Sequence, residues 1–291
     1  MAIHSHILHN GRLGTSGTSV FRPGQIGILA GWGIFTTLRV CNGALFAWER
    51  HWARLTRDAR LINLQMPDPD EVQTDLLRLL DANEQTDCTL RLVIVRNSSG
   101  MWQDELSVAT PVDVAAMTAT SKEWGESVKL GIQPHARHAA CEFSGAKVLS
   151  WAQNLSWAER AAQAGYDEVI LLNEHGRVAE CTSANIFAVV GSRVFTPPQS
   201  EGCLGGITRQ ILLELSGDGL TVEEKSLTVE DLCDADAVFI TSTTRNLLPV
   251  REIAGRSLSG NTSVVSTLAA RFDAFVGRDL AARPRVGAVA A

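Results

Sequence analysis

The sequence has few tyrosines, no long apolar run and no concentration of positive charge. Tyr166 is the single tyrosine among the 291 residues. No apolar run approaches the roughly 18 residues that a membrane-spanning helix needs, so a membrane is not an expected partner. Lysine and arginine number 26 against 32 acidic residues, and no basic block stands out. Nucleic acid is therefore not an expected partner either.

The chain also lacks the spaced cysteine and histidine patterns of disulfide-rich or metal proteins. Its cysteines form no CxxC pair and are far apart, at positions 41, 88, 141, 181, 203 and 233. Such spacing is typical of reduced thiols in the cytoplasm. The N-terminal residues show no charged segment followed by an apolar one, so no secretory signal is expected. There is no HExxH motif, and His135 and His138 near Cys141 are interpreted as loop residues; no metal is expected.

What is present is an apolar content of 45 % in a chain long enough for two domains, each with its own core. Short apolar runs alternate with helical periodicity, which predicts a mixed α and β class. Around "MTATSKEWGES" the hydrophobic periodicity is lost, and this stretch is interpreted as a linker. We therefore expect a small N-terminal domain at 1–118, a linker at 119–126 and a larger C-terminal domain at 127–291.

Local patterns predict the main elements. "FTTLRV", "CNG" and "ALFAW" read as a hairpin with Asn42 and Gly43 in its turn. The periodicity predicts further helices and strands. The expected helices are 50–64, 69–81, 151–165, 205–215 and 263–280, and the expected strands include 88–97, 128–136, 167–173, 180–190 and 237–243.

Two residues stand out as candidate chemical groups. Lys147, in "FSGAKVLSW", is a lone lysine between a loop and a helix of apolar character. A lysine in an apolar pocket can have its pKa lowered and become a nucleophilic amine, although most lysines are solvated surface residues. Glu180, in "AECTSANIFAV", precedes a string of hydroxyls and an apolar run, where a solvated turn residue is the commoner case.

Two segments are candidate anion sites. In "GGITRQIL", Gly205 and Gly206 open a helix whose first N–H groups, with the Thr208 hydroxyl, could bind phosphate; plain capping is the alternative. "TSTTRN", residues 241–246, places several hydroxyls directly after an apolar strand. An amine, two phosphate sites and an acid are together the set that pyridoxal 5′-phosphate requires.

The order and spacing of these motifs resemble the class IV, or fold type IV, pyridoxal-phosphate aminotransferases, which include branched-chain and D-amino acid aminotransferases and aminodeoxychorismate lyases. The resemblance runs from "GILAGWGIFTTLRV" to "PVREIAG", nearly the whole chain. It implies an α+β fold with a small N-terminal α/β domain and a larger, β-barrel-like C-terminal domain with helices. It also implies a homodimer, because a loop of one small domain reaches the neighbouring site.

The resemblance assigns roles residue by residue. Lys147 corresponds to the lysine that forms the Schiff base with the cofactor and moves the substrate proton. Glu180 corresponds to the acid at the pyridine nitrogen, with Asn185 shaping the loop beside it. Arg54 in "HWARL" corresponds to the phosphate-binding arginine. The remaining phosphate ligands that the resemblance implies are Ile207, Thr208, Thr243 and its neighbour Thr244.

The sequence departs from the family near the substrate. "LAGWG" has Ala30 and Trp32 where an aromatic residue and an Asp are usual, and no tyrosine stands in the usual active-site positions. Trp32 and Trp151 are expected to fill that space. Arg91 matches a substrate-carboxylate arginine of branched-chain enzymes, and Arg96 is a second candidate. Because the two are five residues apart on one strand, at most one should face the site.

Three functions follow from these features. The first is an aminotransferase that moves the amino group of a branched-chain or other hydrophobic amino acid to a 2-oxo acid such as 2-oxoglutarate. The second is aminodeoxychorismate lyase, which eliminates pyruvate to give 4-aminobenzoate; Thr36, whose hydroxyl would assist the lysine, resembles that group. The third is a non-catalytic relative that keeps the fold, against which the intact Lys147, Glu180, Arg54 and Thr208 argue.

Overall fold

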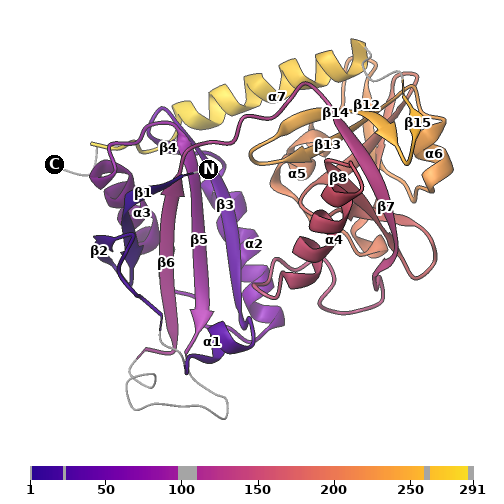
Figure 1. Ribbon diagram of the computed structural model, residues 1–291. Helices are drawn as coiled ribbons and strands as arrows, with labels where there is room; N and C mark the ends of the chain where they lie inside the picture. The colour runs from indigo at the N-terminus through magenta and orange to yellow at the C-terminus, as the bar shows by residue number, and fades with distance from the viewer. Residues whose placement is uncertain (1, 22–23, 98–109, 259–262, 288–291) are drawn as a thin grey trace. The chain divides into compact units, whose positions relative to one another are not determined.

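A computed structural model of the protein describes residues 2–21, 24–97, 110–258 and 263–287 (Figure 1). The chain divides into two compact units. The N-terminal unit is Met1–Lys122 with Lys147–Trp151 and Val276–Ala291, and the C-terminal unit is Glu123–Ala146 with Ala152–Phe275. The boundaries expected from the sequence, 1–118, 119–126 and 127–291, stay a prediction. Residues Lys147–Trp151 belong to the compact N-terminal unit, although they follow the start of the C-terminal unit in the sequence.

The N-terminal unit contains one six-stranded sheet in the order β2-β1-β6-β5-β3-β4, and all its neighbouring strands are antiparallel. The strands are β1 (Ile3–His9), β2 (Arg12–Thr15), β3 (Gly33–Cys41), β4 (Ala44–Leu45), β5 (Cys88–Arg96) and β6 (Val112–Ala119). The helices are α1 (Ile26–Leu29), α2 (Trp48–Leu61) and α3 (Pro69–Ala82). The predicted hairpin is confirmed: Asn42 and Gly43 join β3 to β4 with positive φ angles of 50° and 72°.

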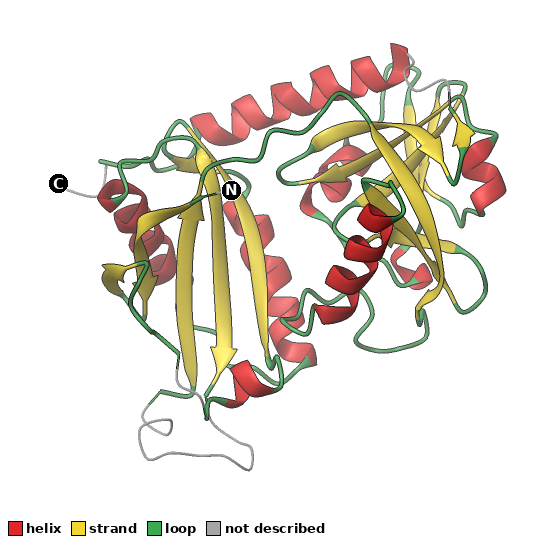
Figure 2. Cartoon of the chain, viewed as in Figure 1, coloured by secondary structure: helices red, strands yellow, loops and turns green. Residues whose placement is uncertain are grey.

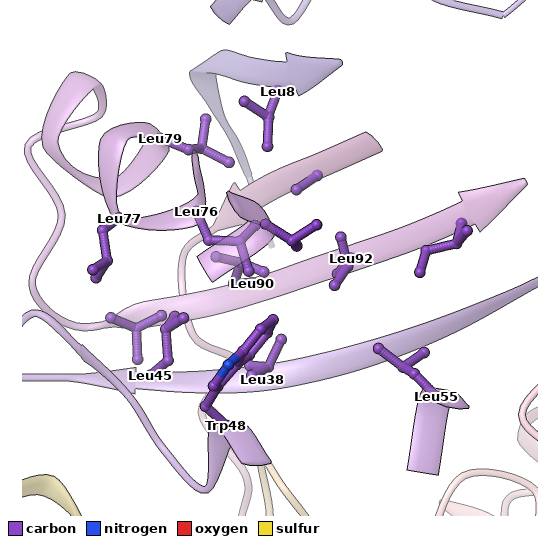
Figure 3. Close-up of a cluster of buried hydrophobic side chains, with 14 of the residues drawn as sticks. Leu8, Leu38, Leu45, Trp48, Leu55, Leu76, Leu77, Leu79, Leu90 and Leu92 are labelled. Carbon is purple, nitrogen blue, oxygen red and sulfur yellow. The ribbon is translucent and has the colours of Figure 1, made fainter. Parts of the chain in front are cut away.

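Alternation along the strands gives this sheet two different faces. Leu38 of β3 and Leu90 and Leu92 of β5 pack with helix residues such as Leu76 and Leu79 in one buried cluster (Figure 3). Residues of the opposite parity form a second cluster on the other face. That second cluster contains Phe35, Val93 and Val95, with Phe21, Leu149 and Trp151 packed against it.

The C-terminal unit contains a nine-stranded mixed sheet in the order β12-β11-β10-β13-β14-β7-β8-β9, with β15 paired to β14. Its strands are β7 (Val128–Arg137), β8 (Glu168–Asn173), β9 (Val178–Cys181), β10 (Asn185–Val190), β11 (Arg193–Thr196), β12 (Thr221–Glu224), β13 (Ala237–Ser242), β14 (Asn246–Ile253) and β15 (Arg256–Ser257). Its helical segments are α4 (Ala152–Gln163), the 3₁₀ turn η2 (Gln199–Glu201), α5 (Ile207–Glu214), α6 (Val229–Cys233) and the greater part of α7 (Ser263–Ala281).

This second sheet curls because its last strand, β9, leads directly into β10, which is third from the opposite end. Strands from both ends then share one buried core. The expected strand at 180–190 is in fact two strands, β9 and β10, with 182–184 between them. Glu180 consequently lies inside β9, and the two hydroxyl residues at 182 and 183 lie between the strands. Helices and strands occur in both units (Figure 2), so the α+β class is confirmed.

Among the described residues, no helix combines the length and the apolar character needed to cross a membrane.

Candidate active site

Lys147 lies along the edge of β3. Its carbonyl accepts the N–H of Phe35 at 3.1 Å, and the N–H of Leu149 donates to the carbonyl of Gly33 at 2.9 Å. Ile34 and Val148 form an antiparallel bridge between these two bonds. The segment 147–149 therefore extends the sheet by a short stretch of chain, and this pairing sets the position of the Lys147 backbone.

The Lys147 amine lies against two aromatic rings. Its Nζ is 4.5 Å from the centroid of the Phe35 ring and 4.8 Å from a ring of Trp151. Phe35 and Trp151 meet edge to face, with centroids 5.4 Å apart. Aromatic faces attract a cation but offer no conventional hydrogen-bond acceptor. The Lys147 amine therefore lies beside two aromatic faces, which come from β3 and from the segment after Lys147.

Arg91 and Arg96 lie on opposite faces of the sheet, as their spacing predicted. The Arg91 guanidinium carbon is 4.5 Å from the centroid of the Phe35 ring, as far from it as the Lys147 amine is. Because both groups lie at that distance from one centroid, the Arg91 guanidinium carbon and the Lys147 Nζ are separated by at most twice that distance. Arg96 shares the other face with the leucines of β5; its Nη1 donates to the carbonyl of Asn63 at 2.7 Å.

Trp32 lies with Arg96. The Arg96 guanidinium carbon is 4.2 Å from the centroid of a Trp32 ring, and the Trp32 indole N–H donates to the carbonyl of Ile62 at 2.9 Å. Both side chains therefore bind the backbone just after α2. Of the three predicted substrate residues, Arg91 alone shares a face with the Lys147 amine.

Helix α2 carries a buried polar stripe that the sequence reading did not recognise as a unit. His51, Arg54 and Asp58 are 0 %, 6 % and 0 % exposed, and their spacing places them on one side of the helix with Leu55. Of these three residues, the sequence singles out Arg54 alone, as a phosphate ligand. The helical spacing of positions 51, 54 and 58, on the same side as Leu55, is the pattern from which the burial of His51 and Asp58 could have been predicted.

Thr36 joins this stripe to the sheet. Its Oγ1 lies 2.7 Å from Nδ1 of His51 and accepts a hydrogen bond from Nη2 of Arg54 at 2.9 Å. Burial, with further contributions from the positive charges of Arg54 and Lys147, holds the pKa of His51 well below its usual value. A neutral imidazole suits this geometry, because its Nδ1 can accept the Thr36 hydroxyl proton while Arg54 donates to the oxygen.

Arg54 is a buried cation with spare hydrogen-bonding capacity. Burial lowers its pKa to about 10, and the neighbouring carboxylate of Asp58 acts in the opposite direction. Arg54 therefore remains charged at neutral pH. Its Nε is buried and finds no hydrogen-bond partner among the described residues. An unsatisfied buried donor of this kind is costly unless a bound anion accepts from it.

In the C-terminal unit, both oxygens of Glu180 are held. Oε1 accepts from Nε and Nη2 of Arg137 at 3.1 and 3.0 Å, and Oε2 accepts from the N–H of Leu204 at 3.1 Å. Glu180 is 7 % exposed. Arg137 also donates to Asn154 at 3.3 Å. Glu180 is therefore paired with a guanidinium and has donors at both oxygens, in a nearly closed environment.

The N-terminus of α5 is built as the sequence suggested. Gly206 is the residue before the helix, and a Cβ atom there would lie 2.0 Å from Oδ1 of Asn185. The Asn185 amide donates to the carbonyl of Leu204 at 2.8 Å, so Asn185 shapes this loop. Thr208 is 2 % exposed, and its hydroxyl has no partner within the part of the chain that the structure describes. Thr208 does not cap the helix.

Thr243 and Thr244 occupy the turn between β13 and β14 and are partly exposed. Arg245, which the sequence reading passed over, holds this turn: its Nη2 donates to the hydroxyl of Ser183 at 3.0 Å and lies 3.4 Å from Oε2 of Glu168. The turn of the threonines is thereby tied to the loop that follows Glu180.

The structure thus gathers the predicted residues into two sets. The set in the N-terminal unit lies on or beside β3 and consists of Lys147, Thr36, Arg54 and Arg91. The set in the C-terminal unit lies in β9, in β10 and at the start of α5, and consists of Glu180, Asn185, Ile207 and Thr208. Among the described residues, no group of three or more His, Cys, Asp or Glu could hold a metal ion. Tyr166 packs against Gly131 in a separate cluster.

The sequence is similar to those of several aminotransferases. A D-alanine aminotransferase of Bacillus licheniformis is 31% identical over 258 residues, which cover 87% of this chain and 89% of the relative. A putative branched-chain-amino-acid aminotransferase of Methanocaldococcus jannaschii is 31% identical over 237 residues, covering 80% and 82%.

Among solved structures, a branched-chain aminotransferase from Thermoproteus uzoniensis, crystallised with norvaline, has a TM-score of 0.86 and 28% identity over 95% of this chain and 96% of that one. The fold expected from the resemblance is confirmed by this likeness. The family description that matches residues 33–253 is amino-transferase class IV. The chain belongs to the class IV aminotransferases.

Proposed function

We propose that this protein is a pyridoxal-phosphate-dependent aminotransferase. It moves the amino group of a branched-chain or other hydrophobic amino acid to a 2-oxo acid such as 2-oxoglutarate. The observation that carries the proposal is the position of the Lys147 amine against Phe35 and Trp151, with its backbone paired to β3, in a chain of this family. A lysine amine whose backbone is held by a sheet is suited to covalent catalysis.

Each unit contains donors of the kind that the cofactor requires. Its phosphate needs a cation and free hydrogen-bond donors, and the buried Nε of Arg54 and the buried hydroxyl of Thr208 both lack partners among the described residues. The first N–H groups of α5, at Ile207 and Thr208, add the positive end of a helix. We propose that these groups, with Thr243 and Thr244, bind the phosphate, and that Glu180 binds the pyridine nitrogen. The bound cofactor supplies an electron sink for the bond that breaks at the substrate Cα.

Lys147 does the proton transfer in this proposal. Its Nζ would take the proton from the substrate Cα and deliver it to carbon C4′ of the cofactor. Glu180, oriented by its two hydrogen bonds from Arg137, would hold a proton on the pyridine nitrogen. Arg91 binds the substrate carboxylate, since it shares the face and the Phe35 ring with Lys147 while Arg96 is bound to the Asn63 carbonyl.

The lyase alternative is not favoured. It depended on Thr36 assisting the lysine, but the Thr36 hydroxyl lies on the α2 face of β3 and is bonded to His51 and Arg54. We propose that Thr36 orients Arg54. The relatives reported above are likewise described as aminotransferases.

A half-reaction tests the proposed function. Purified protein loaded with pyridoxal 5′-phosphate is mixed with L-leucine and no acceptor, and both the visible band of the cofactor and free 2-oxoisocaproate are measured. Loss of the band with an equal amount of oxo acid, reversed by 2-oxoglutarate, is the expected result. D-Alanine in place of L-leucine is the comparison, and a response to it alone would contradict the donor class. Release of pyruvate from aminodeoxychorismate without any acceptor would contradict the aminotransferase itself.

We also propose that the protein is a cytoplasmic homodimer. The proposal rests on the family for the dimer, and on the free state of all the cysteines in the described residues for the compartment. Light scattering should give the mass of two chains. A fully active monomer would contradict the dimer.

A further inference from the structure

Asp58 is a buried carboxylate for which the proposed reaction has no use. It lies on α2, one turn after Arg54, and is 0 % exposed. Its Oδ1 accepts from Nε and Nη2 of Arg57 at 2.9 and 2.6 Å. Its Oδ2 accepts the backbone N–H of Lys147 at 3.0 Å, a bond between residues 89 positions apart in the sequence.

The two backbone groups of Lys147 are therefore held by two different elements. The N–H is bonded to Asp58 of α2, and the carbonyl is bonded to the N–H of Phe35 in β3. These two elements are joined to each other through Thr36, which is bonded to both His51 and Arg54. The Cα atom of Lys147 is consequently fixed with respect to Arg54 by a closed set of hydrogen bonds around one helix and one strand.

A buried carboxylate at position 58 costs more hydration free energy than a neutral acceptor there would. Burying a carboxylate loses its hydration, and this loss is offset only by close opposite charge and well-formed hydrogen bonds. Arg57 supplies the opposite charge at Oδ1, and the Lys147 N–H supplies a hydrogen bond to Oδ2. Asp58 also opposes the effect of burial on the pKa of Arg54. One carboxylate thus serves the lysine backbone and the buried arginine at once.

We infer that Asp58 is a positioning residue for Lys147: it holds the lysine backbone at a set place relative to Arg54, so that the side chain moves about a fixed Cα. The inference rests on the proposed function, in which Arg54 binds the phosphate and Lys147 moves the proton. The simplest alternative is a plain ion pair with Arg57 that stabilises α2 and has no bearing on the lysine.

Amide hydrogen exchange with single-residue resolution tests the inference directly. In the wild-type protein the amide of Lys147 should be protected by at least about tenfold relative to an unbonded amide. In Asp58→Ala this protection should be lost, whereas Asp58→Asn should keep it because the amide oxygen still accepts the N–H. Arg57→Gln, which removes the ion pair and leaves Oδ2 in place, should also keep it.

The half-reaction rate constant should follow the same order. Asp58→Ala is expected to slow it by about 10- to 100-fold with little change in the half-saturating L-leucine concentration, because a displaced lysine loses reactive geometry. Asp58→Asn and Arg57→Gln should stay within about threefold of the wild type. Asp75→Asn, a change to an Arg78-paired aspartate on α3, is the matched control and should have no effect.

Three results would overturn the inference. One is a wild-type Lys147 amide that exchanges as fast as an unbonded one, which needs no variant to fold. Another is an Asp58→Asn variant as slow as Asp58→Ala, and the third is an Arg57→Gln variant as slow as either. Borohydride reduction followed by peptide mapping is run on the wild type in parallel. Cofactor on a different lysine would refute the proposed function, whatever the exchange at Lys147 shows.

Discussion

His51 shows at the scale of one residue how burial decides a charge. Its ring is fully buried beside two cations, so its pKa lies well below the ordinary value, and it is neutral in the folded protein. In the unfolded chain the same ring binds a proton below about pH 6.5. The unfolded state therefore binds the extra proton on acidification, and the free energy of unfolding must fall as the pH drops below that value.

The variant His51→Asn should remove this dependence, because the Asn oxygen can accept from Thr36 but does not titrate. Between pH 6 and pH 5, the slope of the free energy of unfolding should be smaller than in the wild type by up to about 1.4 kcal/mol per pH unit. Urea unfolding at several pH values measures it. His135→Asn, at an exposed residue whose φ of 52° suits Asn, is the control. Equal slopes for wild type and His51→Asn would contradict the neutral, buried His51.

Glu180 is expected to act on the cofactor through its charge. Glu180→Gln keeps the shape and can still bond to Leu204, so cofactor binding should persist. The rate of the half-reaction should fall by about 100-fold or more, because the anion opposite the ring nitrogen is lost. Stopped-flow absorbance measures the rate, and Glu223→Gln, at an exposed carboxylate paired with Arg193, is the control. An unchanged rate would mean that Glu180 does not serve the pyridine nitrogen.

At the scale of elements, the pairing of 147–149 with β3 depends on Gly33. A Cβ atom at Gly33 would lie 2.6 Å from both the carbonyl oxygen of Ile94 and Cδ1 of Leu149. The Leu149 side chain can turn away, but the Ile94 oxygen is backbone within the sheet, so residue 33 itself must shift and the segment paired with it shifts too. Position 33 requires glycine for this close approach, since its φ is not in the left-handed region.

Gly33→Ala should therefore displace the segment that carries Lys147. We expect the half-reaction to slow by about 10- to 100-fold, while the circular dichroism spectrum stays that of the wild type. Gly17→Ala, where an added Cβ meets nothing within 4 Å, is the control. Wild-type kinetics in Gly33→Ala would show that this pairing does not set the lysine.

The elements also show what could be predicted from the sequence. Helices such as α3 and α5, with clear apolar periodicity and Pro69 or Gly206 at their starts, were predicted closely. The buried face of α2 was not, because the periodicity argument counts apolar side chains and three of the buried residues of α2 are His51, Arg54 and Asp58. Their burial depends on Thr36 and Lys147, which lie far away in the sequence.

Each unit of the molecule has its own hydrophobic core and carries one of the two sets of candidate site residues. Leu76 is fully buried in the core of the N-terminal unit, against the sheet that carries Lys147. Leu76→Ala should lower the free energy of unfolding by about 2–5 kcal/mol through lost apolar contact and a cavity. Denaturant unfolding measures it, with Leu13→Ala, at an exposed leucine, as the control. A loss no larger than that of the control would contradict this core.

Motif order was sufficient to predict the family, because the resemblance lies in local patterns such as "GGITR" and "HWARL". Arg137 beside Glu180, Arg245 beside Glu168 and Asp58 beside the Lys147 backbone could not be predicted in the same way. Each pair joins segments that only the fold brings together. Arginines and aspartates alone in a sequence most often belong to the solvated surface.

The central claim is that Lys147 is the amine that binds the cofactor. The chain has only four lysines, Lys122, Lys129, Lys147 and Lys225, so the claim can be tested without ambiguity. The protein is loaded with pyridoxal 5′-phosphate, reduced with borohydride, digested and mapped by mass spectrometry. The account predicts the added mass of the reduced cofactor on the peptide containing Lys147 and on no other. Cofactor on one of the other three lysines, or on none, would contradict it.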